Sequence, residues 1–309
     1  MRAHELLSPE DLSDIYVLER IKGFGPQKFK ELNEAGMSPH DLLRHPREFQ
    51  RFGKRGIDFR KQAESAGSAG RQAALARAIK QIESARQSGG AILTYESPQY
   101  PDILYRSNLP VAALYVRGDI SVLGSDLSVA CVGSRKIRSP YTKFHDKFAS
   151  KAVELGFAIV SGFATGADII GHLAAERSNG RTVCVMPSGL DRPFPPEHKE
   201  IWRRFLDLPG VVFVSEFGFG VGANALNLRK RNKMIAGMAR GVLVSQSTEE
   251  GGAMNAYRFA IEQKKPVATF RSDGSKDTSG NELIAGSAEH VRATVLDGPD
   301  TWAPWLRAL

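Results

Sequence analysis

The sequence has little cysteine and no long apolar run. Cys131 and Cys184 are its only cysteines, and each stands inside an apolar stretch. Two isolated cysteines argue against a disulfide framework or a structural zinc site and favour a reducing compartment. No run reaches the about 18 apolar residues of a membrane helix, and the opening residues MRAHELLSPEDLSD are acidic where a signal peptide is apolar. We therefore expect a cytoplasmic protein without a membrane segment.

The sequence also lacks the motifs of common cofactor enzymes. Neither the dinucleotide pattern G-x-G-x-x-G nor the P-loop G-x-x-x-x-G-K-[ST] occurs, and residues 162–166 contain no lysine for a triphosphate. His172 has no second histidine at metal-ligand spacing, and Ser134 and Ser161 have no assignable base. We therefore expect no cofactor, no metal and no catalytic residue, and predict that the protein is not an enzyme.

Positive charge is in excess and is concentrated in two stretches. The formal net charge is +8. Seven lysines and arginines stand between Arg44 and Lys61 against two acidic residues, and five stand between Arg229 and Arg240 with no acidic residue. Such runs are often only solvated faces, but they also suit a polyanionic partner such as nucleic acid.

Residues 1–62 predict a small, all-helical domain. Ser13 and Asp14 are suited to cap a first helix, and a glycine-rich turn at residues 23–26 separates it from a second. Ser38 and the proline after it are typical of the start of a third helix.

Residues 63–90 predict a linker and a connecting helix. Positions 63–70 hold small and polar residues, a composition typical of a linker. Leu75, Ile79 and Ile82 then share one face of a helix that we place at residues 72–87.

Residues 91–295 predict an α/β domain. Short apolar runs alternate with helical stretches at residues 143–155, 167–177 and 253–263, which favours an extended, Rossmann-like, doubly wound and mostly parallel sheet. The expected buried strands lie at residues 91–94, 113–116, 129–132, 158–160, 182–186, 211–214, 241–245 and 267–270. We expect the tail at residues 296–309 to dock on this domain through its two tryptophans.

Two turns rich in glycine and serine follow predicted strands. The carboxyl ends of parallel strands are where such sheets bind ligands, and glycine lets backbone N–H groups approach a phosphate. Glycine also serves any tight turn, but an arginine beside it adds a bidentate phosphate donor. The candidate phosphate- and DNA-binding residues here are Gly133, Ser134, Arg135, Lys136, Ser161, Gly162, Thr165 and Gly166.

A basic cluster runs directly into an apolar helix. Four of its five residues are cationic, and the fifth offers an amide. A cluster anchored in this way suits a row of phosphates. Its candidate DNA-binding residues are Arg229, Lys230, Arg231, Asn232 and Lys233.

In this order the motifs resemble the DprA/Smf family of DNA-processing proteins, over residues 100–286. The matching residues include Tyr100-Pro101, Leu114-Tyr115-Val116-Arg117-Gly118, Val132-Gly133-Ser134-Arg135, Ser161-Gly162, Gly166, Asp168, His172, Gly189-Leu190-Asp191, Phe194-Pro195, Ser215-Glu216, Gly218, Gly220, Arg231-Asn232-Lys233, Ile235-Ala236-Gly237 and Asn281-Glu282-Leu283-Ile284. The resemblance implies an extended Rossmann-like domain that binds single-stranded DNA, usually forms a homodimer and loads a RecA-type recombinase. The turn at residues 21–26 is similar to a helix-hairpin-helix motif, and the N-terminal domain to a SAM-like one.

The chain departs from the family pattern at several positions. Leu228-Arg229 replaces a Phe-Pro pair, Ala167 replaces isoleucine, and Lys233 replaces an arginine. Ser245-Gln246 stands where the family has an acidic residue, and the winged-helix domain of many members is not expected here.

Two alternatives remain open. A diverged member of this family is also suited to act as an antitoxin or regulator in a phage-defence or toxin–antitoxin module, with a cognate toxin as partner. The second alternative is a nucleotide-cleaving phosphoribohydrolase, for which Glu250-Gly251-Gly252 would supply a carboxylate beside a glycine turn.

Overall fold

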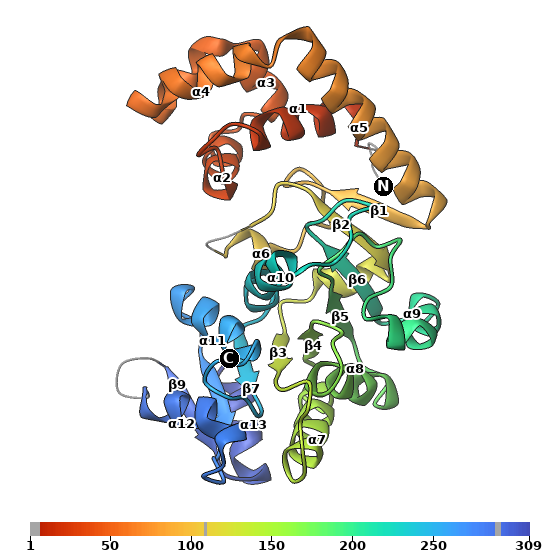
Figure 1. The fold of residues 1–309 in the computed structure, drawn as a ribbon, viewed down its shortest axis with the longest axis vertical. Helices are drawn as coiled ribbons and strands as arrows, with labels where there is room; N and C mark the ends of the chain where they lie inside the picture. Colours follow the sequence, from red (N-terminus) through yellow and green to blue (C-terminus); the bar gives the residue numbers. More distant parts are fainter. Residues whose placement is uncertain (1–6, 108–109, 288–291) are drawn as a thin grey trace.

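The computed structural model describes residues 7–107, 110–287 and 292–309. A nine-stranded sheet carries helices on both faces, and five further α-helices lie beyond one end of it (Figure 1). Within the described chain, no helix combines the length and apolar character needed to cross a membrane. The α/β class and the N-terminal helical region predicted from the sequence are confirmed.

The N-terminal helices begin at well-defined caps. They are α1 (Pro9–Glu19), α2 (Pro26–Glu34), α3 (Pro39–Arg44), the 3-10 helix η1 (Pro46–Phe52), α4 (Lys54–Ser65) and α5 (Gly67–Gln87). Ser38 caps α3 in a reciprocal capping box with Asp41, as expected. The predicted cap of α1 is wrong: Ser8 accepts the Asp11 N–H at 3.1 Å, and Ser13 and Asp14 lie inside the helix.

The predicted linker at residues 63–70 is also wrong, because this segment is helical. Only Ala66 separates α4 from α5. Alanine has the highest helix propensity, so a small-residue composition fits a helix as well as a linker. Ala63, Ala74 and Ala78 are buried, in a hydrophobic core that extends from α1 to strands of the sheet. The boundaries of the predicted domains stay a prediction.

The sheet has the order β1-β2-β6-β5-β4-β3-β7-β8-β9, in which β1, β2 and β6 pair antiparallel and all other neighbours pair parallel. Its strands are β1 (Gly90–Leu93), β2 (Leu114–Gly118), β3 (Ser128–Val132), β4 (Ala158–Ser161), β5 (Thr182–Val185), β6 (Val211–Ser215), β7 (Gly241–Val244), β8 (Val267–Phe270) and β9 (Ala293–Leu296). Eight of them match predicted strands within two residues. The edge strand β9 was not predicted, and three of its four residues are at least partly exposed.

Helices cover both faces of the sheet. One face carries α6 (Asp102–Tyr105), α10 (Ala225–Gly237), α11 (Ala253–Glu262) and α12 (Ser279–Gly286). The other carries α7 (Tyr141–Glu154), α8 (Ala167–Arg177), α9 (Lys199–Leu206) and α13 (Pro299–Arg307). Short 3-10 helices connect them, at η2 (Ile120–Gly124), η3 (Pro196–His198) and η4 (Lys276–Thr278). The tail docks as expected, with Trp302 and Trp305 of α13 against Phe148 of α7.

The topology creates a switch point between β3 and β7. From β3 the chain continues to β4 on one side, whereas from β7 it continues to β8 on the other. The turns after these neighbouring strands therefore diverge and leave a crevice at their carboxyl ends, the usual ligand site of doubly wound sheets.

Candidate functional site

A groove of about 760 Å³ opens at this switch point. We call it the strand-end groove. Its walls are the turn after β3, the turn after β7 and the first half of α10. Its lining residues include Gly133, Ser134, Arg135, Lys136 and Arg138 on one side, Ser247, Thr248, Gly251, Gly252 and Asn255 on another, and Leu228, Arg229, Arg231 and Asn232 on the helix.

The turn after β3 is held in place by Gln246. The Gln246 carbonyl accepts the Ser134 N–H at 2.7 Å, and its side-chain Oε1 accepts the Arg138 N–H at 2.9 Å. These bonds fix the backbone and leave the side chains of Arg135 and Lys136 exposed at the groove. The amide that replaces the family's acidic residue thus supports the phosphate-binding candidates.

The turn after β4 lies beneath the groove. Ser161 is fully buried, and its hydroxyl donates to the Cys131 carbonyl at 2.6 Å. Gly166 adopts φ +80°, and a Cβ there would lie 2.3 Å from the Ser134 carbonyl oxygen. The first amide of α8, on Ala167, already donates to that same oxygen at 3.1 Å. One amide at the start of α8 is therefore already engaged, and Thr165 is not among the residues that line the groove, so anion binding by this turn stays a prediction.

Helix α10 places only part of the basic cluster at the groove. Arg229 and Asn232 are one helical turn apart and line the groove, where the Asn232 amide donates to the Gly252 carbonyl at 3.2 Å. Lys230 and Lys233 are not among the residues that line it. Burial raises the pKa of Glu216, and these two lysines oppose the rise. The cluster therefore does not form one continuous row in the groove.

Arg231 lies in the floor of the groove, not on its rim. Its side chain is 5% exposed, and its Nη1 lies 3.8 Å from Oδ2 of Asp168 and donates to the Val185 carbonyl at 3.2 Å. Burial lowers the pKa of Arg231 and raises that of Asp168, and each charge opposes the shift of the other. A Cβ on Gly162 would lie 1.2 Å from the same Nη1, so only glycine leaves room for the guanidinium.

The groove carries an excess of positive charge. Five cationic side chains line it against two acidic ones, an excess of three. Both acidic residues have cationic partners, Asp168 with Arg231 and Asp277 with Arg138. The exposed cations Arg135, Lys136 and Arg229 are absent from the ion pairs found among the described residues.

Sequence reasoning missed one wall of the groove. Arg138, Ser247, Thr248, Asn255 and Asp277 line it without having been predicted. Ser247 and Thr248 follow β7. The rule that ligands bind at carboxyl strand ends would have found them, had β7 been recognised as the neighbour of β3.

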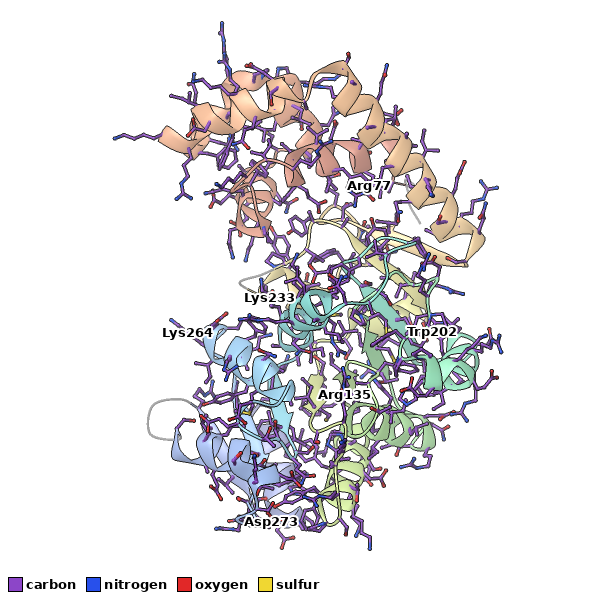
Figure 2. The ribbon with its side chains drawn as sticks, in the orientation of Figure 1. Arg77, Arg135, Trp202, Lys233, Lys264 and Asp273 are labelled. Atoms are coloured by element: carbon purple, nitrogen blue, oxygen red, sulfur yellow. The ribbon has the colours of Figure 1, made fainter. Side chains whose placement is uncertain are left out.

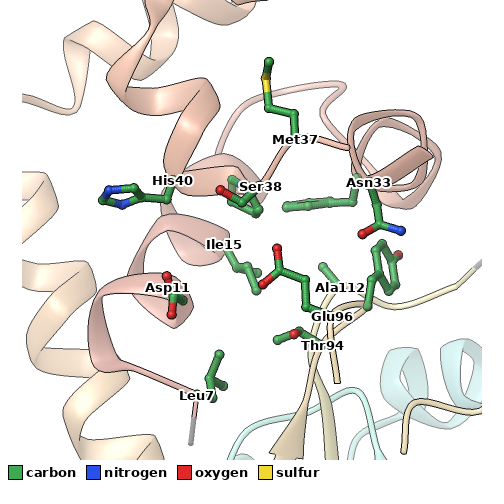
Figure 3. A pocket seen from close by; sticks show the side chains of 13 residues that line it. Leu7, Asp11, Ile15, Asn33, Met37, Ser38, His40, Thr94, Glu96 and Ala112 are labelled. Atoms are coloured by element: carbon green, nitrogen blue, oxygen red, sulfur yellow. The ribbon is translucent and has the colours of Figure 1, made fainter. Parts of the chain in front are cut away.

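A second hollow lies between the N-terminal helices and the segment after β1 (Figure 3). Asp11, His40 and Glu96 line it beside apolar side chains such as Ile15 and Met37. Its volume of about 30 Å³ suffices for one or two water molecules. The described residues contain no cluster of three His, Cys, Asp or Glu side chains able to hold a metal ion. The strand-end groove is therefore the candidate functional site.

A family profile described as DNA recombination-mediator protein A matches residues 91–296, which include the whole groove. The chain belongs to this family. Protein Smf of Synechocystis is 31% identical over 60% of this chain and 47% of its own, and Protein Smf of Escherichia coli is 31% identical over 66% and 54%. The chain thus spans about half the length of these relatives.

Two solved structures share the fold. DNA processing protein A from Streptococcus pneumoniae superposes with a TM-score of 0.72 over 94% of this chain and 95% of its own, at 22% identity. DNA processing protein A from Helicobacter pylori, whose structure is described by its single-stranded DNA binding mode, superposes with a TM-score of 0.59 over 71% and 94%, at 24% identity. At these identities the likeness shows the fold alone.

Proposed function

We propose that this chain binds single-stranded DNA along the strand-end groove and acts as a recombination mediator or DNA-processing factor, without chemistry on the DNA. The observation that carries the proposal is the excess of three positive charges in one groove at the switch point. Membership of the recombination-mediator family supports it, because the family match spans the same residues.

Three exposed cations are proposed as phosphate contacts. Arg135 and Lys136 reach the groove from the turn after β3, and Arg229 reaches it from α10. Contacts to phosphates carry little sequence information, so binding should tolerate any base sequence. A single strand is flexible enough to follow a concave groove, whereas a duplex stays stiff over about 50 nm.

The remaining candidates are proposed to hold these cations in place. Gly133, Gly162 and Gly166 permit close packing of the turns, and Arg231 forms the floor beneath them. Lys230 and Lys233 are proposed to contact DNA outside the groove, because they are not among the residues that line it.

The nucleotide-cleaving alternative finds no support in the groove. Asp168 and Asp277 are the carboxylates among its described lining residues, and both lie in ion pairs. Glu250, the proposed catalytic carboxylate, is not among the residues that line it.

The antitoxin alternative gains no support from the names of the relatives above. From the family resemblance we propose that a RecA-type recombinase is the protein partner. We also propose, on the same basis, that the chain forms a homodimer.

The salt dependence of binding tests the proposal. Each phosphate contact contributes about 0.7 to the slope of log affinity against log salt for single strands, so Arg135→Ala with Arg229→Ala should flatten it by about 1.4. A charge-matched control, Lys80→Ala with Lys199→Ala, removes two exposed lysines that do not line the groove and should keep the wild-type slope. The proposal fails if the first variant keeps that slope too, or if the wild type prefers duplex DNA in the same salt.

A further inference from the structure

A second basic hollow lies at the amino ends of the strands, at the end of the sheet opposite the strand-end groove. We call it the amino-edge hollow. It has a volume of about 330 Å³ and is lined by residues that precede β3, β7 and β8, among them Asp126, Arg240 and Lys264, together with Arg106 at the end of α6. It therefore opens at the amino ends of β3, β7 and β8, and the carboxyl ends of β3 and β7 form the strand-end groove.

Five cationic side chains line this hollow against one acidic side chain, Asp126. Lys265 has a structural role, because its ammonium donates to the carbonyls of Ala236, Gly237 and Ala239 at 2.6–2.8 Å and caps the end of α10. Arg240 is partly engaged through the Asp126 carbonyl at 2.8 Å.

The other three cations remain available to a ligand. Lys264 and Arg292 are exposed. Arg106 forms an ion pair with Asp102, but the two side chains are 71% and 67% exposed, and such surface pairs contribute little. These three charged side chains make no strong interaction within the protein that a bound anion would have to break.

Gln263 adds a polar group at the wall of the same hollow. Among the described residues, neither its side-chain nitrogen nor its oxygen has a hydrogen-bond partner, although both are buried. Buried amides without partners are rare in folded proteins, but because neither atom is exposed, a strand in the hollow would not contact this amide directly.

Helix α10 connects the two basic sites. Its first half lines the strand-end groove, and Ala239 and Arg240, just beyond its end, line the amino-edge hollow. Its 13 residues span about 20 Å. Lys230 and Lys233, which are not among the residues that line the groove, lie on the same helix. Figure 2 labels Lys233 on α10 and Lys264 just beyond the end of α11, nearer the margin of the view.

We propose that the amino-edge hollow is a second binding site for the phosphodiester backbone, occupied by the same DNA strand after it leaves the strand-end groove along α10. This inference rests on the proposed function. Arg106, Lys264 and Arg292 contact phosphates there, and Lys230 and Lys233 contact the strand on the way. The footprint of the protein on DNA is therefore longer than the strand-end groove alone.

The test compares two strand lengths on one variant. Arg106→Gln, Lys264→Asn and Arg292→Gln remove three charges, and asparagine suits position 264, where φ is +55°. An oligothymidine of about 30 nucleotides should lose about 2 from its salt slope, at about 0.7 per contact, while one of about 6 nucleotides keeps its slope because it fills only the groove. The charge-matched control is Lys80→Gln, Lys147→Gln and Lys199→Gln, which should bind both lengths like the wild type.

The outcomes separate this inference from the proposed function. An unchanged slope for the long strand overturns the second site, as does an equal loss for both lengths, which would mean a general effect of charge. Failure of the wild type to bind either length overturns the proposed function instead. If the triple variant unfolds, Arg106→Gln and Lys264→Asn singly should each remove about 0.7 from the long-strand slope.

Discussion

Arg231 and Asp168 form a buried ion pair beneath the strand-end groove, with Nη1 3.8 Å from Oδ2 and side chains that are 5% and 9% exposed. Arg231 comes from α10 and Asp168 from α8, which cover opposite faces of the sheet. The pair therefore joins the two helical layers across the carboxyl edge of the strands, at the floor of the candidate site.

Replacing Arg231 should destabilise the fold strongly. Arg231→Met leaves Asp168 as a buried charge without its partner, and breaking such a pair costs about 3–5 kcal/mol. The free energy of unfolding in urea measures this loss. Arg229→Met is the matched control, because Arg229 is exposed on the same helix and its loss should leave stability nearly unchanged. Equal stability of the two variants would show that the buried pair contributes nothing.

The destabilisation of Arg231→Met should shrink as the pH falls. Burial raises the pKa of Asp168, and Arg231 opposes the rise, so the pKa climbs further in the variant. A carboxyl whose folded-state pKa exceeds its unfolded value of about 4 binds more protons when folded, so its contribution to stability falls as the pH rises between these values. Urea unfolding from pH 4 to 7, values chosen to span about that window, should show the variant approaching the wild type at the acidic end. A constant difference at every pH would contradict this role of Asp168.

Gly162→Ala should act through Arg231. Its Cβ would lie 1.2 Å from the Arg231 Nη1, so the guanidinium must move, at a cost of about 1–3 kcal/mol. In an Arg231→Ala background the space is open and the same substitution should cost little. A double-mutant cycle on unfolding free energies measures this coupling. Additive effects would mean that Gly162 is needed for another reason.

Gln81 should anchor the N-terminal helices to the α/β domain. From α5 its amide nitrogen donates to the Phe219 carbonyl at 3.0 Å, and its oxygen accepts the Phe219 N–H at 2.7 Å. Gln81→Leu leaves both buried backbone groups without partners, at about 1–3 kcal/mol each. Thermal or urea unfolding measures the loss. Gln72→Leu, at an exposed position of the same helix, should have little effect on stability. An equally small effect of Gln81→Leu would show that Gln81 does not anchor the N-terminal helices.

Local patterns were enough to predict most of the sheet. The buried strands carry continuous apolar runs, such as Val129–Val132 within β3 and Val211–Val214 within β6, because both of their faces are covered by helices. The edge strand β9 has an exposed face, so this pattern fails there. Residues 63–70 misled for another reason: small residues suit a linker, but alanine also has the highest helix propensity, and within this segment only Ala63 is buried in the core.

By itself, the sequence determined the α/β class, the glycine-rich turns after β3 and β4 and the basic cluster on α10, because strand and helix periodicity and turn chemistry depend on neighbouring residues. Only the tertiary structure decided which candidates face the groove. The rotation of α10 about its axis places Arg229, but not Lys230, among the residues that line the groove, and the packing of α10 near α8 buries Arg231 against Asp168. Such choices depend on contacts between residues far apart in the chain, which a local pattern does not contain.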